Sequence, residues 1–238
     1  MTRKGKLYLI PNTLGDAKFE RILPSNNFTI IENIKHYIVE DLRNARRFLS
    51  KAGWKGKIDD LTFYLLNEHS RIEDIQQHLK MADSGTDIGL LSDAGTPCVA
   101  DPGADIVSMA HEKGIQVIPL IGPSSILLSL MASGFNGQNF AFLGYLPRER
   151  SQRVKSIKQL ESKVFKKNQT QIFIEAPYRN NQMLESLLQS CTLQTKVCVA
   201  RDITLDEELI ISKTVSEWKK EKSLPDLHKR NTIFLLYK

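Results

Sequence analysis

This 238-residue sequence has only three cysteines and no long apolar run. No stretch reaches the ~18 consecutive apolar residues of a transmembrane helix, and the N-terminus lacks the apolar region of a signal peptide. Cys98, Cys191 and Cys198 have no metal-ligand spacing and lie within or beside apolar runs. We therefore expect a cytoplasmic protein with no membrane partner and no metal, whose cysteines are reduced core residues.

A strong excess of one charge is also missing. The sequence has 33 Lys+Arg and 27 Asp+Glu, a net charge of +6, and 41% of it is hydrophobic. This composition is ordinary for a globular protein, and the length suffices for one large or two medium domains. The mild basic excess suits a polyanionic partner such as RNA, and solvated helix faces would explain it too.

A stretch rich in turn-forming residues follows the apolar run 88–91. It contains SDAGTP at 92–97 and DPG at 101–103, which combine flexible glycines with prolines that fix φ. This pattern is typical of a buried parallel strand that ends at a ligand-binding crevice. Its spacing matches neither a phosphate-binding loop with its lysine nor a dinucleotide-binding loop. The pattern therefore argues against a nucleoside triphosphate as the ligand.

Short apolar runs alternate with helical segments through the first half, which predicts a parallel sheet there. The strands expected in this half are 7–10, a run within 29–39, 61–66, 88–91 and 116–120, and the helices start at 40 and cover 70–81 and 104–113. In the second half we expect strands at 140–146, 171–174, 196–201, 208–214 and 231–237, and helices at 126–133, from 148 to 163 and from 215. We divide the chain into two α/β domains, 1–120 and 121–238.

The loop at 92–103 resembles the signature loop of the tetrapyrrole methylase superfamily, the class III S-adenosylmethionine (SAM) methyltransferases. Within it, the sequence is most similar to the ribosomal small subunit methyltransferase I family, whose members methylate a ribose 2′-hydroxyl of rRNA. Further matches are Pro11, Leu14 and Gly15, Glu40-Asp41-x-Arg43, GYLP at 144–147, and Glu175 with Arg179. Departures from the pattern are Thr13, Asp16, Leu42 and Tyr178. The resemblance covers essentially the whole chain but not the C-terminal extension of many relatives, an element that could dock RNA.

The resemblance implies an α/β fold of two domains, with a mainly parallel N-terminal sheet, a mixed C-terminal sheet and SAM in the cleft between them. It also implies a homodimer and, as partner, ribosomal RNA or the small ribosomal subunit. Carried over position by position, the cofactor-binding residues would be Leu14, Gly95, Thr96, Val99, Ser124, Ser125, Glu175, Ala200 and Asn231. Capping of the next helix would by itself explain one of the two serines.

Methyl transfer from SAM mainly requires the nucleophile, carbon and sulfur to be aligned. A hydroxyl nucleophile also benefits from a general base. The titratable groups expected around the crevice are Glu40, Asp41, His69 and Asp101. We favour Asp41 or His69 as the base, with Arg43 orienting an acid or a phosphate. The structural alternatives are a capped helix with a basic solvated face and a loop histidine without a catalytic role.

Three functions are compatible with these patterns. An RNA ribose methyltransferase is favoured by the overall resemblance, the basic balance and Glu40-Asp41-x-Arg43. Methylation of a tetrapyrrole or another small acceptor is favoured by the absent extension and by the altered turn at 11–16. The third, from a different class, is a SAM-binding or RNA-binding protein without catalysis.

Overall fold

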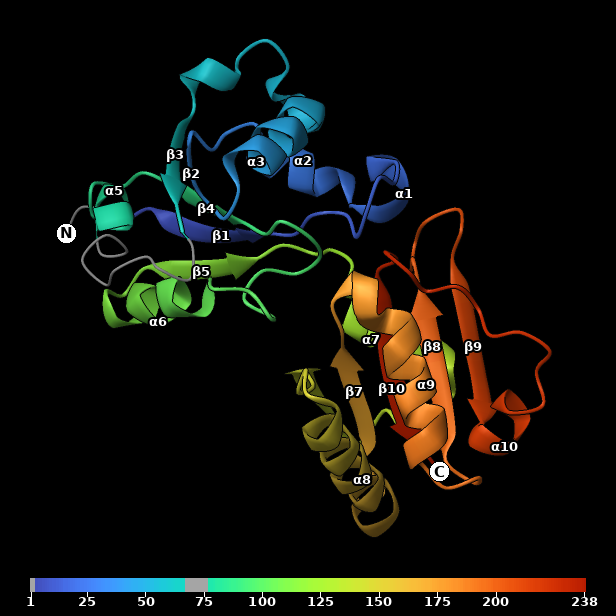
Figure 1. Cartoon of the computed structure of the whole chain (residues 1–238). Helices are drawn as coiled ribbons and strands as arrows, with labels where there is room; N and C mark the ends of the chain where they lie inside the picture. The colour runs from blue at the N-terminus through green and yellow to red at the C-terminus, as the bar shows by residue number, and fades with distance from the viewer. Residues whose placement is uncertain (1–2, 67–76) are drawn as a thin grey trace. The chain divides into compact units, whose positions relative to one another are not determined.

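The computed structural model of the protein describes residues 3–66 and 77–238. The chain forms two compact units, Met1–Ser124 and Ser125–Lys238, and each has its own sheet (Figure 1). The second unit opens with a helix, α7 (Ser125–Ser133). Within the described ranges, every helix is too short or too polar to cross a membrane.

The N-terminal unit is built on a five-stranded sheet with the order β3-β2-β4-β1-β5. Its strands are β1 (Lys6–Ile10), β2 (His36–Val39), β3 (Thr62–Leu65), β4 (Ile88–Leu91) and β5 (Gln116–Pro119). Every neighbouring pair is parallel, which confirms the expected parallel sheet. The carboxyl ends of all five strands therefore lie at one edge of the sheet.

Helices cover both faces of this sheet (Figure 1). The helical segments are α1 (Phe19–Ile22), α2 (Ser25–Ile31), α3 (Leu42–Leu49), η1 (Ser50–Trp54), η2 (Ile58–Asp60), α5 (Lys80–Asp83) and α6 (Ala104–Glu112). One core cluster joins Tyr37 of β2 to Phe48 of α3 and Trp54. The other joins Ile88 of β4 to Ile106 of α6. The central strands β2 and β4 are thus buried on both faces, as their continuous apolar runs require, whereas the edge strands β3 and β5 are partly exposed.

The run 29–39 departs from the expected strand. Residues 29–31 belong to α2, and β2 begins only at His36. Helix α2 buries Asn27 and Ile31, which lie about one turn apart, and Asn27 Nδ2 donates to the backbone oxygen of Ile121 at 2.8 Å. These contacts override the β-propensity of the apolar run. The helix expected at 70–81 falls largely outside the described residues.

The C-terminal unit carries a second five-stranded sheet, with the order β6-β7-β10-β8-β9. Its strands are β6 (Phe140–Tyr145), β7 (Thr170–Ile174), β8 (Lys196–Arg201), β9 (Leu209–Thr214) and β10 (Thr232–Tyr237). Only β6 and β7 pair in parallel, and the other three pairs are antiparallel. The expected mixed sheet is confirmed.

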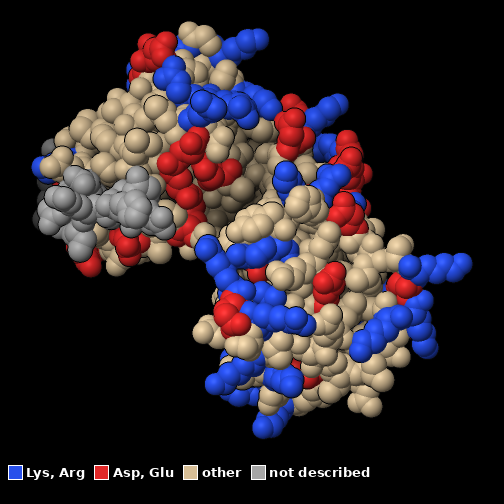
Figure 2. Space-filling model, viewed as in Figure 1, with Lys and Arg blue, Asp and Glu red and all other residues tan. Residues whose placement is uncertain are grey.

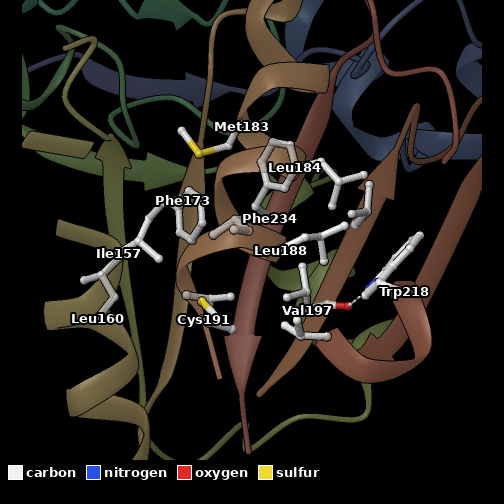
Figure 3. Packing of buried hydrophobic residues seen from close by; sticks show 14 of the residues in the cluster. Ile157, Leu160, Phe173, Met183, Leu184, Leu188, Cys191, Val197, Trp218 and Phe234 are labelled. Atoms are coloured by element: carbon white, nitrogen blue, oxygen red, sulfur yellow. Dashed lines mark hydrogen bonds between the residues drawn. The ribbon is translucent and has the colours of Figure 1, made fainter. Parts of the chain in front are cut away.

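One apolar core holds the C-terminal unit together. The helical segments of this unit are α7, α8 (Arg150–Lys167), η3 (Pro177–Arg179), α9 (Asn180–Ser190) and α10 (Val215–Trp218). Figure 3 shows Ile157 of α8 and Leu184 of α9 packed with Phe173 and Phe234 of the sheet. Trp218 closes the cluster, and its Nε1 donates to the backbone oxygen of Val197 at 2.9 Å.

The cysteines of the chain are free. Cys191 and Cys198 are buried, and burial raises the pKa of each thiol to about 12. Both thiols therefore stay protonated at neutral pH and act as small apolar side chains.

Candidate active site

Two loops at the carboxyl edge of the N-terminal sheet, those after β1 and β4, are held together by hydrogen bonds. Asn12, after β1, and Gly95, after β4, exchange both backbone hydrogen bonds, with N···O distances of 2.9 and 3.2 Å. Asn12 Nδ2 also donates to the backbone oxygens of Ser92 and Asp93, at 3.3 and 3.2 Å. The Asn12 side chain thus fixes the start of the signature loop to the first turn of the chain.

The loop after β5 joins them through contacts that leave no room for a side chain. Gly95 has φ +69°, and a Cβ there would lie 3.0 Å from Leu14 Cδ2 and 3.4 Å from the Pro123 oxygen. A Cβ on Gly122 would lie 2.3 Å from the Pro11 ring. The structure therefore brings together Leu14, Gly95 and the peptide just before Ser124, three places where cofactor contacts are expected.

The signature loop continues into a strained turn. Cys98 and Ala100 both adopt left-handed backbone conformations, with φ of 66° and 58°. Val99 between them is 46% exposed, whereas Thr96 is half-buried. Left-handed backbone at non-glycine residues costs on the order of 1–3 kcal/mol and clusters at ligand sites. The turn therefore presents Val99 at the loop surface, where a ligand could contact it.

A pair of carboxyl groups lies at the same edge. Glu40 follows β2 directly, and its half-buried carboxyl is hydrogen-bonded to that of Asp101 in the signature loop. Burial, and then the hydrogen bond and charge of Asp101, raise the pKa of Glu40 to about 8. A carboxyl group that titrates near neutral pH is suited to take up a proton during a reaction.

Asp41 and Asp93 extend this acidic edge. Asp41 is the N-cap of α3, and its Oδ1 accepts from the backbone N–H of Asn44 at 2.7 Å. Asn44 Nδ2 in turn donates to Asp93 Oδ2 at 3.3 Å. Burial raises the pKa of Asp93, as do the charges of Asp41 and Asp101. Figure 2 shows acidic side chains gathered on the N-terminal unit.

The remaining predicted catalytic residues are less defined by their surroundings. Arg43 is exposed on the first turn of α3, two residues from the Asp41 cap. His69 lies outside the described residues. The sequence did not single out Asn44, although its place three residues after an acidic N-cap is the signal that could have identified it.

The predicted cofactor contacts of the C-terminal unit lie at one edge of the second sheet. Ala200 of β8 and Ile174, the last residue of β7, both pair with Ile233 of β10, so Glu175 and Asn231 fall at the same end of the strands. Ala200 is fully buried in the sheet. The backbone oxygen of Asn231 accepts from the N–H of Asp202 at 2.8 Å. Ser125 is the first residue of α7 in this unit.

Glu175 is buried and held by two neighbours. Its Oε1 accepts from the Ala176 N–H at 2.7 Å and from Arg179 Nε at 3.1 Å, and the Arg179 guanidinium forms an ion pair with it. A buried carboxylate bound in this way has little freedom to reorient. The Glu175 carboxylate thus fixes the start of the segment after β7.

Solved structures similar to this chain include two methyltransferases. The chain superposes on the methyltransferase CobJ with a TM-score of 0.64 at 17% identity, covering 98% of this chain and 94% of that one. It superposes on uroporphyrin-III C-methyl transferase from Thermus thermophilus, solved with S-adenyl homocysteine, with a TM-score of 0.56 at 16% identity and 98% coverage of both chains. These similarities establish the α/β fold of this class of methyltransferases.

Residues 26–219 match the family model of the tetrapyrrole (corrin/porphyrin) methylases. The chain belongs to this family and is a SAM-dependent methyltransferase. The resemblance of the loop at 92–103 is thereby confirmed, and a protein without catalysis is set aside.

Curated relatives share one name. The chain is 30% identical to "Ribosomal RNA small subunit methyltransferase I" of Thermotoga maritima over 94% of this chain and 96% of that protein. Identity to the protein of that name from Bacillus subtilis is 30%, over 92% of this chain and 72% of the relative. For Vibrio cholerae it is 27%, over 97% and 76%.

The residues at the edge of the N-terminal sheet fit SAM. The cofactor carries a positive sulfonium and a positive ammonium group, and Asp41 and Asp93 supply carboxylates while the loop at 92–103 contains no lysine. The contacts made by Gly95 bring the backbones of the three loops together, so that most ligand contacts there would be to main-chain atoms or shape contacts.

Proposed function

We propose that this methyltransferase transfers the methyl group of SAM to a ribose 2′-hydroxyl of small-subunit rRNA. The observation that carries the proposal is the similarity to the Thermotoga maritima protein. The two sequences are 30% identical, and the match covers 96% of the length of that protein. A relative with that name thus matches this chain nearly end to end. A homodimer and a cytoplasmic location belong to the same proposal.

The cofactor contacts that we propose are those carried over from the family pattern. In the N-terminal unit they are Leu14, Gly95, Thr96, Val99 and Ser124, and in the C-terminal unit Ser125, Glu175, Ala200 and Asn231. Bound SAM would supply a methyl group that is already attached to its leaving group, the sulfonium sulfur. The task left to the chain is to align the acceptor and to remove its proton.

Glu40 is our choice for the general base. The ribose oxygen forms a bond to the methyl carbon as the carbon–sulfur bond breaks, and the hydroxyl proton passes to the Glu40 carboxylate. The pKa of Glu40, raised to about 8, places this group near the optimum for accepting a proton at neutral pH. Asp41 is engaged as a helix cap and adds negative charge, and Arg43 on the same helix orients an acceptor phosphate. His69 is the second candidate for the base.

A small tetrapyrrole is the second candidate acceptor. It is favoured by the turn at 11–16, where Thr13 stands in place of a proline of the rRNA methylase pattern. Thr13 Oγ1 donates to the Gly15 backbone oxygen at 2.7 Å, so the turn is closed by a contact that a proline could not make.

Methyl transfer to competing acceptors separates the two. The protein is incubated with methyl-labelled SAM and small ribosomal subunits from a strain that lacks its gene, in parallel with a panel of porphyrinoids. The proposal expects label in the rRNA of the subunits and none in the panel. Label in a porphyrinoid, or in neither acceptor, would overturn the rRNA assignment.

A further inference from the structure

Two tyrosines project into solvent at the edge of the C-terminal sheet that carries Glu175. Tyr145, the last residue of β6, is 64% exposed, and Tyr178 in η3 is 59% exposed. Tyr145 pairs in register with Ile174, the residue just before Glu175. Large aromatic rings are costly to leave in water, so two of them at one sheet edge indicate a surface that binds something.

An irregularity in β6 directs Tyr145 outward. The register against β7 shifts between Phe142 and Tyr145, and Gly144 has φ +66°, a conformation that favours glycine. Such bulges re-aim the side chain that follows them and are common beside functional sites. In a regular strand successive side chains alternate between the two faces of the sheet, and the shift interrupts this alternation just before Tyr145.

Arg179 lies beside one of the two rings. Its guanidinium lies 5.2 Å from the centre of the Tyr178 ring. Tyr145 contributes to the raised pKa of Arg179, less than Glu175 and Tyr178 do. The buried ion pair with Glu175 fixes this guanidinium in place. The result is a preorganised surface of two exposed rings and one planar cation, which we name the tyrosine platform (Tyr145, Tyr178 and Arg179).

The positive charge of the chain is concentrated in the same unit. Residues 125–238 contain 18 Lys+Arg and 11 Asp+Glu, whereas residues 1–124 contain 15 and 16. Helix α8 begins five residues after Tyr145 and buries Ile157, Leu160 and Val164 on one face. In the first half of the helix, the opposite face is exposed and carries Lys155 and Lys158, which we call the basic face of α8. Figure 2 shows Lys and Arg gathered on this unit where Figure 1 places α8.

We propose that the tyrosine platform and the basic face of α8 together bind single-stranded RNA, with unpaired bases stacked on Tyr145 and Tyr178 and the phosphates along the lysines. Exposed aromatic rings beside a basic track are the combination by which proteins hold single strands without reading their sequence. The inference rests on the proposed rRNA acceptor and names the surface that would hold it.

The test is fluorescence anisotropy of the full chain with a labelled single-stranded RNA 12-mer, and with the same sequence as a duplex. The wild type binds the single strand more tightly than the duplex. Tyr145→Ala and Tyr178→Ala each weaken binding to the single strand by about tenfold, because stacking contributes roughly 1–3 kcal/mol per base. Tyr145→Phe and Tyr178→Phe retain binding, since phenylalanine keeps the stacking surface.

A matched control for the ring substitutions lies at the other end of β6. Phe140→Ala removes a ring that is 39% exposed there and leaves binding unchanged.

The contribution of the lysines is measured from the salt dependence of binding. Lys155→Glu with Lys158→Glu lowers the slope of log Kd against log salt concentration by about 1.4, the value for two lost phosphate contacts. The charge-matched pair Lys219→Glu with Lys220→Glu, just after α10, leaves that slope unchanged. Circular dichroism confirms that each variant is folded.

The inference is overturned if both tyrosine-to-alanine variants bind the single strand as the wild type does, if the Phe140→Ala control loses binding equally, or if the duplex is preferred. The rRNA proposal has its own readout. Transfer of label to ribosomal subunits with unaltered binding in the tyrosine variants removes the platform and keeps the function. Loss of binding in those variants without any rRNA methylation keeps the platform and removes the function.

Discussion

Glu40 and Asp101, far apart in the sequence, share a hydrogen bond between their carboxyl groups. They meet because Glu40 directly follows β2 and Asp101 lies in the loop after β4, and these strands are parallel neighbours in which Val39 pairs with Leu91. A proton held between two carboxyl groups leaves only when the pH rises well above the usual range of an acid. The pair therefore links the chemistry of the edge to pH.

The pH dependence of methyl transfer should report this pair. With Glu40 as the base, kcat/KM rises with pH up to about 8, because only the deprotonated carboxyl can accept the acceptor's proton. Asp101→Asn removes a neighbouring negative charge, so the rise moves to lower pH. At pH 8 and above, Glu40→Gln lowers kcat by about 10²-fold or more, and the difference from the wild type narrows as pH falls. A pH profile that is identical in the wild type and Asp101→Asn would contradict the role of the pair.

The free energy of unfolding should also depend on pH through Glu40, and the direction of this dependence is defined. The pKa of Glu40 is about 8 in the folded chain and 4.5 in an ordinary glutamate, so between these values the folded state binds more protons and the free energy of unfolding falls as pH rises. Glu40→Gln removes this loss. Relative to the wild type, the variant gains about 1 kcal/mol between pH 5 and pH 9, a value reduced by the partial exposure of the group. Urea denaturation at the two pH values measures it, and Glu112→Gln, an exposed residue of α6, should show no gain.

Asp41 separates a structural role from a chemical one. Asp41→Ala removes the cap of α3 and lowers the free energy of unfolding by about 1 kcal/mol, whereas Asp41→Asn keeps a capping oxygen and the stability. In Asp41→Asn, methyl transfer falls less than in Glu40→Gln. Activity lost completely in Asp41→Asn, with stability retained, would make Asp41 the base instead.

Gly122 tests the close approach of the loops after β1 and β5. Gly122→Ala places a methyl group 2.3 Å from the Pro11 ring, so one of the two loops must move, at a cost of about 2 kcal/mol in the free energy of unfolding. Gly137→Ala is the matched control, since a Cβ there meets no atom within 4 Å. Equal melting temperatures of the two variants would show that the loops do not depend on this contact.

The parallel sheet and its ligand edge could be predicted because buried strands are written as short apolar runs that end in turn-forming residues. Helices α1, α2 and α9 were not anticipated. Helix α2 is rich in residues that favour strands, and it is helical because Asn27 and Ile31 are buried against the rest of the unit.

The site divides in the same way. Glu40 and Asp41 were placed at the edge because they follow a strand directly. The hydrogen bond of Glu40 to Asp101 and that of Asn44 to Asp93 join separate loops, so they depend on how the strands pair rather than on any local pattern. The register that brings Tyr145 beside Ile174 is likewise a property of the folded sheet.

The most direct measurement of the central claim is the chemical position of the transferred methyl group. Small ribosomal subunits labelled by this protein from methyl-labelled SAM are digested to nucleosides, which are separated and identified by mass spectrometry. The account predicts that the label appears in a single 2′-O-methylnucleoside and that Glu40→Gln slows its appearance by about 10²-fold or more at pH 8. Label on a base, or no label in RNA alongside methylation of a porphyrinoid, would contradict it.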